Sequence, residues 1–190
     1  MIVYLHGFNS SPQSHKAQVL GRYMAERGLQ AEYACPALPP LASKAVEQIE
    51  LLLKKREDKP VCLVGSSLGG FYATHLAEKR GLKAVLLNPA IDPHVGLREY
   101  LGRQTNLHTG EPYELTEAHL REWQDLYAPR ITPGRYLLIV ETGDEVLDYR
   151  RALARYTGAE QIVVPGGDHS LQSFPRHLPR ILEFCRAAAL

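Results

Sequence analysis

Short apolar segments alternate with segments of helical periodicity along most of the chain. Six segments rich in Val, Ile, Leu and Tyr are candidate strands: 2–5, 31–35, 60–64, 84–88, 136–141 and 161–164. Segments between them carry apolar residues at helical spacing, such as Val46, Ile49 and Leu53. This alternation predicts an α/β fold with a six-stranded, mostly parallel sheet flanked by helices. The second strand is expected outside the first, with the third to sixth extending the other way.

One interval between strands is far longer than a single helix requires. Residues 91–135 form this insertion, whose polar, turn-like middle, "GRQTNLHTGEPYEL", lies between helical patterns at 93–100 and 116–127. No linker separates it, so residues 1–190 are expected to form one domain with the insertion as a lid or pocket wall. A surface excursion without function is the alternative. Helices are expected to begin at Ser11 with Pro12, at Asp148 and at Ser173.

Composition argues against several classes of partner. Lys plus Arg number 22 and Asp plus Glu number 21, and neither sign forms a long run, so neither nucleic acid nor an acidic membrane is expected as a partner. The three cysteines form no cluster with histidine, which predicts that the protein has no metal site and works in a reduced compartment. No apolar run approaches the roughly 18 residues of a membrane span, and no cationic leader precedes "IVYL". A cytoplasmic protein without membrane insertion is the default expectation.

The stretch "VGSSLGG" places serines between glycines where a strand pattern gives way to a helical one. Only Ser67 has glycine both two residues before it (Gly65) and two after it (Gly69), so G-x-S-x-G selects Ser67 and not Ser66. A sharp strand-to-helix turn forces positive φ on the apex residue, and flanking side chains would collide. Gly70 is expected to serve close packing. A helix start without chemistry and a phosphate loop are alternatives, but the Lys-Ser/Thr ending of a Walker loop is missing.

A nucleophilic serine needs a base and an acid that orients it, and on such a fold they follow the serine in the order acid, histidine. Asp144 lies just past the strand 136–141 and is the preferred acid. Glu141, Glu145 and Asp148 compete with it: Glu141 is expected to face along the strand and Asp148 to cap a helix.

The candidate base follows the last strand, in "VVPGGDHSL". His169 lies in that glycine loop, whereas the other seven histidines lie in helical patterns, in the insertion or at the first strand's exit. Asp168, its neighbour, is expected in solvent or bonded to the loop.

An oxyanion formed at the serine requires hydrogen-bond donors. One is expected to be the backbone N–H of Leu68, the residue after the nucleophile. The other is expected from Phe8 in "YLHGFNSSP", where Gly7 lets the backbone turn. His6 is expected either to hold this loop through its ring nitrogens or to be a plain strand-end histidine.

With these residues in place, the chain resembles the α/β-hydrolase superfamily and, within it, the YqiA-like bacterial esterases. The resemblance covers essentially the whole chain and lies in "YLHGFNSSP", "VGSSLGGFYAT", "NPA", "TGDEVLDYR" and "GGDH". It implies a small esterase without a cofactor, with Ser67, Asp144 and His169 at the triad positions. Asp168 stands where such proteins often carry Asn, and Ser170 and Leu171 where they often carry Ala and Phe, which bears on the pocket wall.

The sequence therefore predicts a serine esterase that hydrolyses small or short-chain acyl esters through an acyl-enzyme. A thioesterase acting on acyl-coenzyme A or an acyl carrier, and a ligand-binding module without turnover, are the alternatives. Arginines of the insertion are candidate phosphate contacts of a thioester substrate: Arg98, Arg103 and Arg121. Large apolar residues could contact the acyl group or belong to the core: Phe71, Leu107, Tyr113, Trp123 and Leu171.

Overall fold

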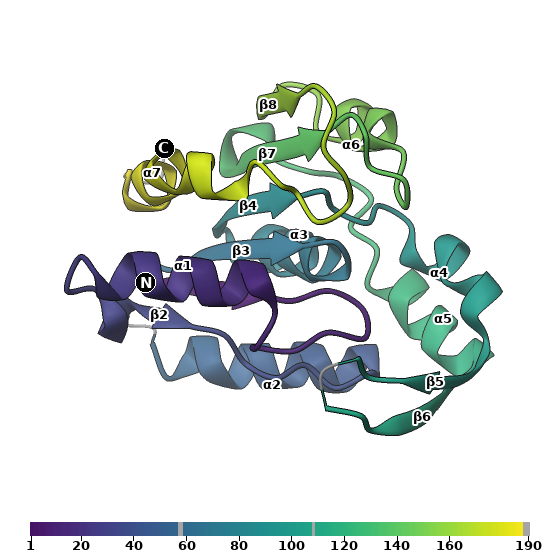
Figure 1. Cartoon of the computed structure of the whole chain (residues 1–190). Helices are drawn as coiled ribbons and strands as arrows, with labels where there is room; N and C mark the ends of the chain where they lie inside the picture. Colours follow the sequence, from purple (N-terminus) through teal and green to yellow (C-terminus); the bar gives the residue numbers. More distant parts are fainter. Residues whose placement is uncertain (57–58, 108, 188–190) are drawn as a thin grey trace.

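A computed structural model describes residues 1–56, 59–107 and 109–187. Six parallel strands form its central sheet in the order β2-β1-β3-β4-β7-β8, which confirms the predicted order (Figure 1). The strands are β1 (Ile2–Leu5), β2 (Tyr33–Ala34), β3 (Cys62–Ser66), β4 (Lys83–Leu87), β7 (Tyr136–Glu141) and β8 (Glu160–Val164). All six lie within about two residues of the predicted segments. The four inner strands are largely buried and read as continuous apolar runs, whereas the edge strands β2 and β8 are half-buried or exposed.

Helices cover both faces of this sheet. On one face lie α1 (His15–Ala25) and α7 (Phe174–Arg186); on the other lie α2 (Ala42–Lys54), α3 (Leu68–Arg80) and α6 (Tyr149–Arg155). Successive strand residues alternate between two hydrophobic clusters: Val3 and Leu5 pack with α2 and α3, whereas Ile2 and Tyr4 pack with α1. This period of two follows from strand geometry. Because all six strands are parallel, their carboxyl ends lie at the same edge of the sheet.

The insertion contains a hairpin that its sequence did not predict. It comprises α4 (Pro93–Gly96), the 3₁₀ turn η2 (Arg98–Tyr100), strands β5 (Gly102–Thr105) and β6 (Pro112–Leu115), α5 (Glu117–Asp125) and the 3₁₀ turn η3 (Pro133–Arg135). Strands β5 and β6 pair antiparallel, so the expectation of a merely turn-like middle was wrong. Exposed and half-buried residues alternate along β5, a polar pattern that offers little apolar signal for a strand.

A buried tryptophan anchors the second half of the insertion. Trp123 on α5 is fully buried, and its indole N–H donates to the Tyr72 hydroxyl on α3 at 2.8 Å. At the start of α2, the Ser43 N–H donates to Glu122 at 2.8 Å. The insertion thus packs on the face carrying α2 and α3, as the sequence analysis expected of a segment folded onto the main body.

Helix starts agree with the sequence in part. Asp148 caps α6 by accepting the Arg150 N–H at 3.0 Å, and Ser173 precedes the first residue of α7. The expectation for Ser11 was wrong, because its Oγ accepts the Gln13 N–H in a turn that precedes the helix. Helix α1 begins only after Ser14. In the described ranges, no helix is both long and apolar enough to cross a bilayer.

Candidate active site

Ser67 lies at the turn from β3 into α3 in the conformation expected of an elbow. Its φ is 53° and its ψ −122°, a left-handed backbone that a serine adopts only under constraint. Three backbone hydrogen bonds supply the constraint: the Ser67 N–H donates to the Leu87 carbonyl at 3.1 Å, and its carbonyl accepts from Gly70 at 2.9 Å and Ala90 at 3.0 Å. The serine is therefore fixed between β4 and the first turn of α3.

Glycine is required around this turn for steric reasons. A Cβ at Gly65 would lie 2.3 Å from the Gly69 carbonyl oxygen, as the sequence analysis expected. A Cβ at Gly69 would lie 1.9 Å from the carbonyl oxygen of Leu5, so the obstacle there is the end of β1 and not Gly65. Gly70 lets α3 approach the segment after β4, since its Cβ would lie 2.7 Å from the Cβ of Pro89.

The structure brings together the three side chains that the sequence selected. His169 Nε2 lies 3.1 Å from Ser67 Oγ, and His169 Nδ1 lies 2.8 Å from Asp144 Oδ2 and 3.0 Å from Oδ1. A carboxylate at Nδ1 favours the tautomer with its proton there, which leaves Nε2 free to accept the serine proton. The Asp144 side chain is 1% exposed and that of His169 is 23% exposed. The Asp144 carboxylate is shielded from solvent, whereas the His169 imidazole remains accessible to a ligand.

Asp144 is held in place by further hydrogen bonds, and the acidic residues near it, Glu145 and Asp168, bind other groups. Asp144 Oδ1 also accepts the N–H groups of Val146 and Leu147, at 2.9 and 2.8 Å, which fixes the carboxylate. Glu145 accepts the His169 N–H at 3.0 Å. Asp168 bonds within its own loop, as expected, and a hydrogen bond from the Ser170 hydroxyl holds the pKa of its carboxyl below the usual value.

Glu141 supports the histidine loop from beneath. This carboxylate at the end of β7 is 1% exposed and accepts the N–H groups of Asp168 at 2.9 Å, Gln172 at 3.0 Å and Ser173 at 2.7 Å. Burial acts to raise its pKa, but the hydrogen bonds from Ser173 and its neighbours outweigh burial and lower the pKa. The sequence analysis named Glu141 only as a competitor of Asp144 and did not identify this supporting role.

Asn88 joins the same loop to the sheet. Its Nδ2 donates to the carbonyls of Asp168 at 3.1 Å and His169 at 3.4 Å, and its Oδ1 accepts the Glu141 N–H at 3.0 Å. The residue has a φ of 41°, in the left-handed region that Asn tolerates. The sequence analysis assigned it no role, although it begins the "NPA" block at the exit of β4.

His6 fixes the peptide group expected to supply an oxyanion donor. The Leu38 N–H donates to His6 Nε2 at 2.9 Å, so the ring proton is on Nδ1, which lies 3.1 Å from the Gly7 carbonyl oxygen. That carbonyl and the Phe8 N–H belong to one planar peptide group and point in opposite directions. Holding the carbonyl therefore sets the direction of the N–H. Of the two expectations for His6, the first is closer to the structure: one ring nitrogen binds the loop at Gly7, and the other binds Leu38 in the segment before α2.

The elbow and this loop lie against each other. A Cβ at Gly7 would lie 3.2 Å from the Ser67 Cβ and 3.7 Å from its Oγ, so the backbone approaches the hydroxyl closely. Neither the Phe8 nor the Leu68 N–H donates to another group among the described residues. Two backbone donors beside the serine are thus available to a ligand.

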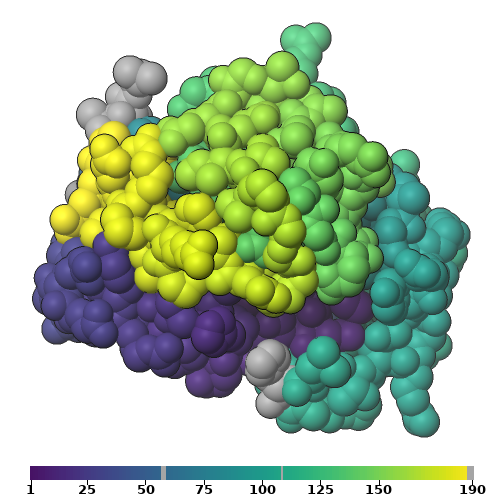
Figure 2. Space-filling model, turned by 45° about the horizontal axis from the view of Figure 1, so that its top comes forward, coloured from purple at the N-terminus to yellow at the C-terminus, as the bar shows by residue number. Residues whose placement is uncertain are grey.

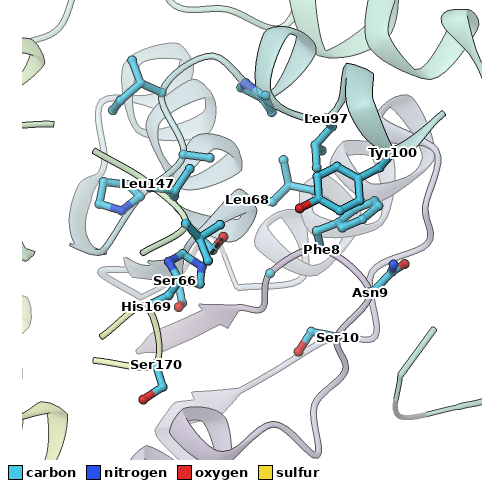
Figure 3. Close-up of a pocket in the computed structure, with 18 of the residues that line it drawn as sticks. Phe8, Asn9, Ser10, Ser66, Leu68, Leu97, Tyr100, Leu147, His169 and Ser170 are labelled. Carbon is cyan, nitrogen blue, oxygen red and sulfur yellow. Dashed lines mark hydrogen bonds between the residues drawn. The ribbon is translucent and has the colours of Figure 1, made fainter. Parts of the chain in front are cut away.

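A cavity of about 820 Å³ opens beside Ser67 and His169. Apolar side chains gather on one side of it, and Figure 3 shows Phe8, Leu68, Leu97 and Tyr100 grouped there. Polar residues also line the cavity, among them Ser10, Ser14, His15, Lys16 and Ser170. The insertion forms part of the wall, as expected.

Most of the predicted substrate contacts lie elsewhere. Of the five apolar candidates only Leu107 lines this cavity, whereas Phe71, Trp123 and Leu171 are buried in the core. Tyr113 is half-buried and lies outside the cavity wall. The alternative, that these residues belong to the core, is therefore correct for Phe71, Trp123 and Leu171, because large apolar side chains are usually buried.

The prediction that arginines of the insertion line the cavity and contact a phosphate was also wrong. None of Arg98, Arg103 and Arg121 lines the cavity, and Arg98 pairs with Glu117 at 2.7 Å. Two cations do line it: Arg151, which pairs with Asp92, and Lys16. Lys16 donates to the Ser170 carbonyl at 2.7 Å, and burial lowers the pKa of its ammonium group to about 8.

The parallel sheet, its strand order and the serine elbow define an α/β-hydrolase fold. Solved structures agree: the mouse α/β hydrolase domain-containing protein 10 superimposes with a TM-score of 0.74 at 18% identity, covering 96% of this chain and 87% of that one. A monoacylglycerol lipase from Paleococcus ferrophilus gives a TM-score of 0.68 at 16% identity over 97% and 93% of the two chains.

The chain belongs to the UPF0227 family, described as "Uncharacterised protein family (UPF0227)", whose model matches residues 1–186. A UPF0227 protein of Pasteurella multocida (strain Pm70) is 23% identical over 186 residues, which cover 97% of this chain and 98% of that protein. The match spans the elbow, the acid, the histidine loop and the insertion.

Proposed function

We propose that this protein is a serine hydrolase that cleaves small acyl esters through a covalent acyl-enzyme. The observation that carries the proposal is the continuous hydrogen-bonded series from Ser67 Oγ through His169 to the buried Asp144, at 3.1 and 2.8 Å, with its serine facing a cavity. One structural neighbour is named as a monoacylglycerol lipase, that is, an enzyme acting on esters of glycerol. This similarity supports the proposal that the same fold carries out ester hydrolysis here.

In the first half-reaction, Ser67 Oγ attacks the ester carbonyl carbon while His169 Nε2 takes the hydroxyl proton. The carbonyl oxygen becomes an oxyanion that accepts hydrogen bonds from the N–H groups of Phe8 and Leu68. The bond to the leaving oxygen then breaks, and His169 returns its proton to that oxygen, so the alcohol departs. Asp144 keeps the imidazole oriented and stabilises its positive charge.

In the second half-reaction, water attacks the acyl group on Ser67. His169 takes a proton from the water, and the same two N–H groups hold the second oxyanion. The bond to Ser67 Oγ breaks, His169 reprotonates the serine, and a carboxylic acid leaves. Every proton therefore passes through one ring nitrogen, which the distances allow.

Neither alternative has a separate observation in its favour. A thioesterase would use the same triad, but the arginines expected to hold a phosphorylated carrier do not line the cavity. A binding module without turnover has no need of a buried aspartate bonded to the histidine that faces the serine. We therefore favour ester hydrolysis.

Fluorophosphonate labelling tests the proposal, because this reagent reacts with a serine that a base has activated. Intact mass spectrometry is expected to show one adduct on the wild-type protein and on Ser10→Ala, a control serine lining the same cavity. No adduct is expected on Ser67→Ala. Labelled wild-type protein should also lose the ability to hydrolyse 4-nitrophenyl butyrate. An adduct that persists in Ser67→Ala, or a folded wild-type protein that takes none, contradicts the proposal.

A further inference from the structure

The insertion's hairpin holds the side chain of Asn9, the residue that follows Phe8. Asn9 Nδ2 donates to Gln104 Oε1 at 3.2 Å, and Asn9 Oδ1 accepts from the Tyr113 hydroxyl at 2.7 Å. Gln104 and Tyr113 lie directly opposite each other on β5 and β6. Two neighbouring strands thus hold the two ends of one amide.

The hairpin also bonds to the backbone of this loop. The Leu107 N–H donates to the Asn9 carbonyl at 3.0 Å, and Asn106 Nδ2 donates to the Ser10 carbonyl at 2.9 Å. Four hydrogen bonds therefore connect residues 95 to 104 positions apart in the chain. In Figure 2 the teal insertion lies beside the purple N-terminal segment.

The partners of Asn9 select an amide at this position. Gln104 Nε2 donates to the Tyr100 carbonyl at 2.6 Å, so its Oε1 is the atom left to face Asn9. A side chain that donates to Gln104 and accepts from Tyr113 must carry both a donor and an acceptor. Asn9 also has a φ of 51°, which Asn tolerates better than most residues. An aspartate at position 9 would place a carboxylate oxygen against Gln104 Oε1, and neither oxygen could donate a hydrogen bond.

These contacts fix Phe8 from the side opposite to His6. His6 holds the Gly7 carbonyl before it, and the hairpin holds Asn9 after it. The Phe8 ring also packs edge-on against Tyr100 of the insertion, with centroids 6.1 Å apart at 62°. Figure 3 shows the two rings side by side, with Asn9 on the adjoining stretch of loop.

We infer that Asn9 is a positioning residue through which the insertion's hairpin holds the Phe8 N–H in the oxyanion site. The inference rests on the proposed function and assigns the hairpin a part in the chemical step in addition to its place in the cavity wall. Loosening this anchor displaces a donor that matters most in the transition state, so it lowers kcat more than it raises KM.

The test compares Asn9→Gly and Asn9→Asp with the wild-type protein. Asn9→Asp keeps the backbone and the acceptor but loses the donor to Gln104, whereas Asn9→Gly tolerates the positive φ, removes both side-chain bonds and also frees the backbone. Removing an oxyanion donor outright costs about 10²–10³ in kcat; loosening one should cost about tenfold or more, with KM for 4-nitrophenyl butyrate changed by less than about threefold. Tyr113→Phe, which removes one hydroxyl, should show a smaller loss.

Arg103→Ala is the matched control, because Arg103 lies on the exposed face of the same hairpin. It should retain wild-type kcat. Backbone ¹⁵N relaxation of the Phe8 amide supplies a second readout that does not depend on turnover. That amide should be rigid in the wild-type protein and mobile on the nanosecond timescale in Asn9→Asp, in which no glycine loosens the backbone.

Measuring both kcat and the mobility of the Phe8 amide distinguishes a failure of the esterase proposal from a failure of the positioning role of Asn9. A Phe8 amide that stays rigid in Asn9→Asp, or kcat unchanged in both Asn9 variants of an active enzyme, overturns the positioning role. An equal loss in Arg103→Ala also overturns it, because general weakening of the hairpin would then explain the effect. A wild-type protein that is inert while Phe8 becomes mobile only in the Asn9 variants refutes the esterase proposal and upholds the anchor.

Discussion

Replacing Glu141 with glutamine should destabilise the protein far more than such a small change suggests. Oε2 of Glu141 accepts two N–H groups of the histidine loop, from Asp168 and Gln172, and Oε1 accepts a third from Ser173. A glutamine oxygen in place of Oε2 keeps two of these bonds, but its NH₂ group then faces the Ser173 N–H, donor against donor. The opposite amide orientation loses two bonds.

The magnitude follows from those contacts. A hydrogen bond to a charged group contributes about 1.5–3 kcal/mol, and an unsatisfied buried donor costs a similar amount. Losing one bond and weakening two others should lower the free energy of unfolding by about 2–4 kcal/mol. For a chain of this size, that corresponds to a fall in Tm of roughly 5–15 °C.

The effect should depend on pH with a defined sign. Because the folded-state pKa of Glu141 lies below its value of 4.5 in the unfolded chain, the carboxylate stabilises the fold fully above about pH 4.5. That stabilisation is lost as pH falls through the lower folded-state pKa. The difference between the wild-type protein and Glu141→Gln should therefore be largest near pH 7 and shrink below pH 4.5.

Urea unfolding of both proteins at pH 7, 5 and 3.5, followed by circular dichroism, measures this difference. Glu160→Gln is the matched control, since Glu160 pairs with Arg180 at the surface and such pairs contribute about 0–1 kcal/mol. The reasoning is refuted if Glu141→Gln unfolds within about 0.5 kcal/mol of the wild-type protein at pH 7. A difference that stays constant down to pH 3.5 would refute the role of the charge.

Two further predictions concern the elbow and the cavity. Gly69→Ala should prevent folding or lower Tm by more than about 10 °C, because its Cβ would lie 1.9 Å from the Leu5 carbonyl oxygen. Gly96→Ala is the control: a Cβ at Gly96 would have no atom within 4 Å, so Tm should stay within about 2 °C of the wild-type value. Lys16→Met should raise Tm at pH 7, because burial lowers the Lys16 pKa from 10.5 to about 8 and the fold therefore carries the cost of a buried charge below pH 8. From pH 8 upward the folded protein sheds that proton before the unfolded chain does, so the advantage of Lys16→Met should be smaller at pH 9.5; an advantage that is absent at pH 7, or that grows with pH, contradicts this account.

The triad was accessible from sequence because each member lies at the end of a strand with a strong apolar pattern. In a parallel sheet those ends meet at one edge, so Ser67, Asp144 and His169 could be brought together from strand order alone. The close backbone approach at Gly65 also follows from local geometry. Their catalytic roles remain predictions that labelling will test.

The supporting residues could not be found in the same way. Glu141 and Asn88 act through backbone groups of a loop 27 to 81 positions away, and backbone donors carry no signature in the sequence. Asn9 depends on two strands of four residues each, of which β5, with the sequence GRQT, has no apolar face for a pattern to detect. Each of these is a hydrogen-bond relation between distant segments.

The sequence by itself determined the α/β fold, the order of its strands and the serine elbow, because apolar periodicity and glycine sterics act over a few residues. Tertiary structure alone decided which side chains form the cavity wall, placing Lys16 there and Phe71 and Trp123 in the core. It also decided what holds the catalytic loops in position. The physical reason is that hydrogen bonds and packing between distant segments depend on where the chain folds back, which no local pattern records.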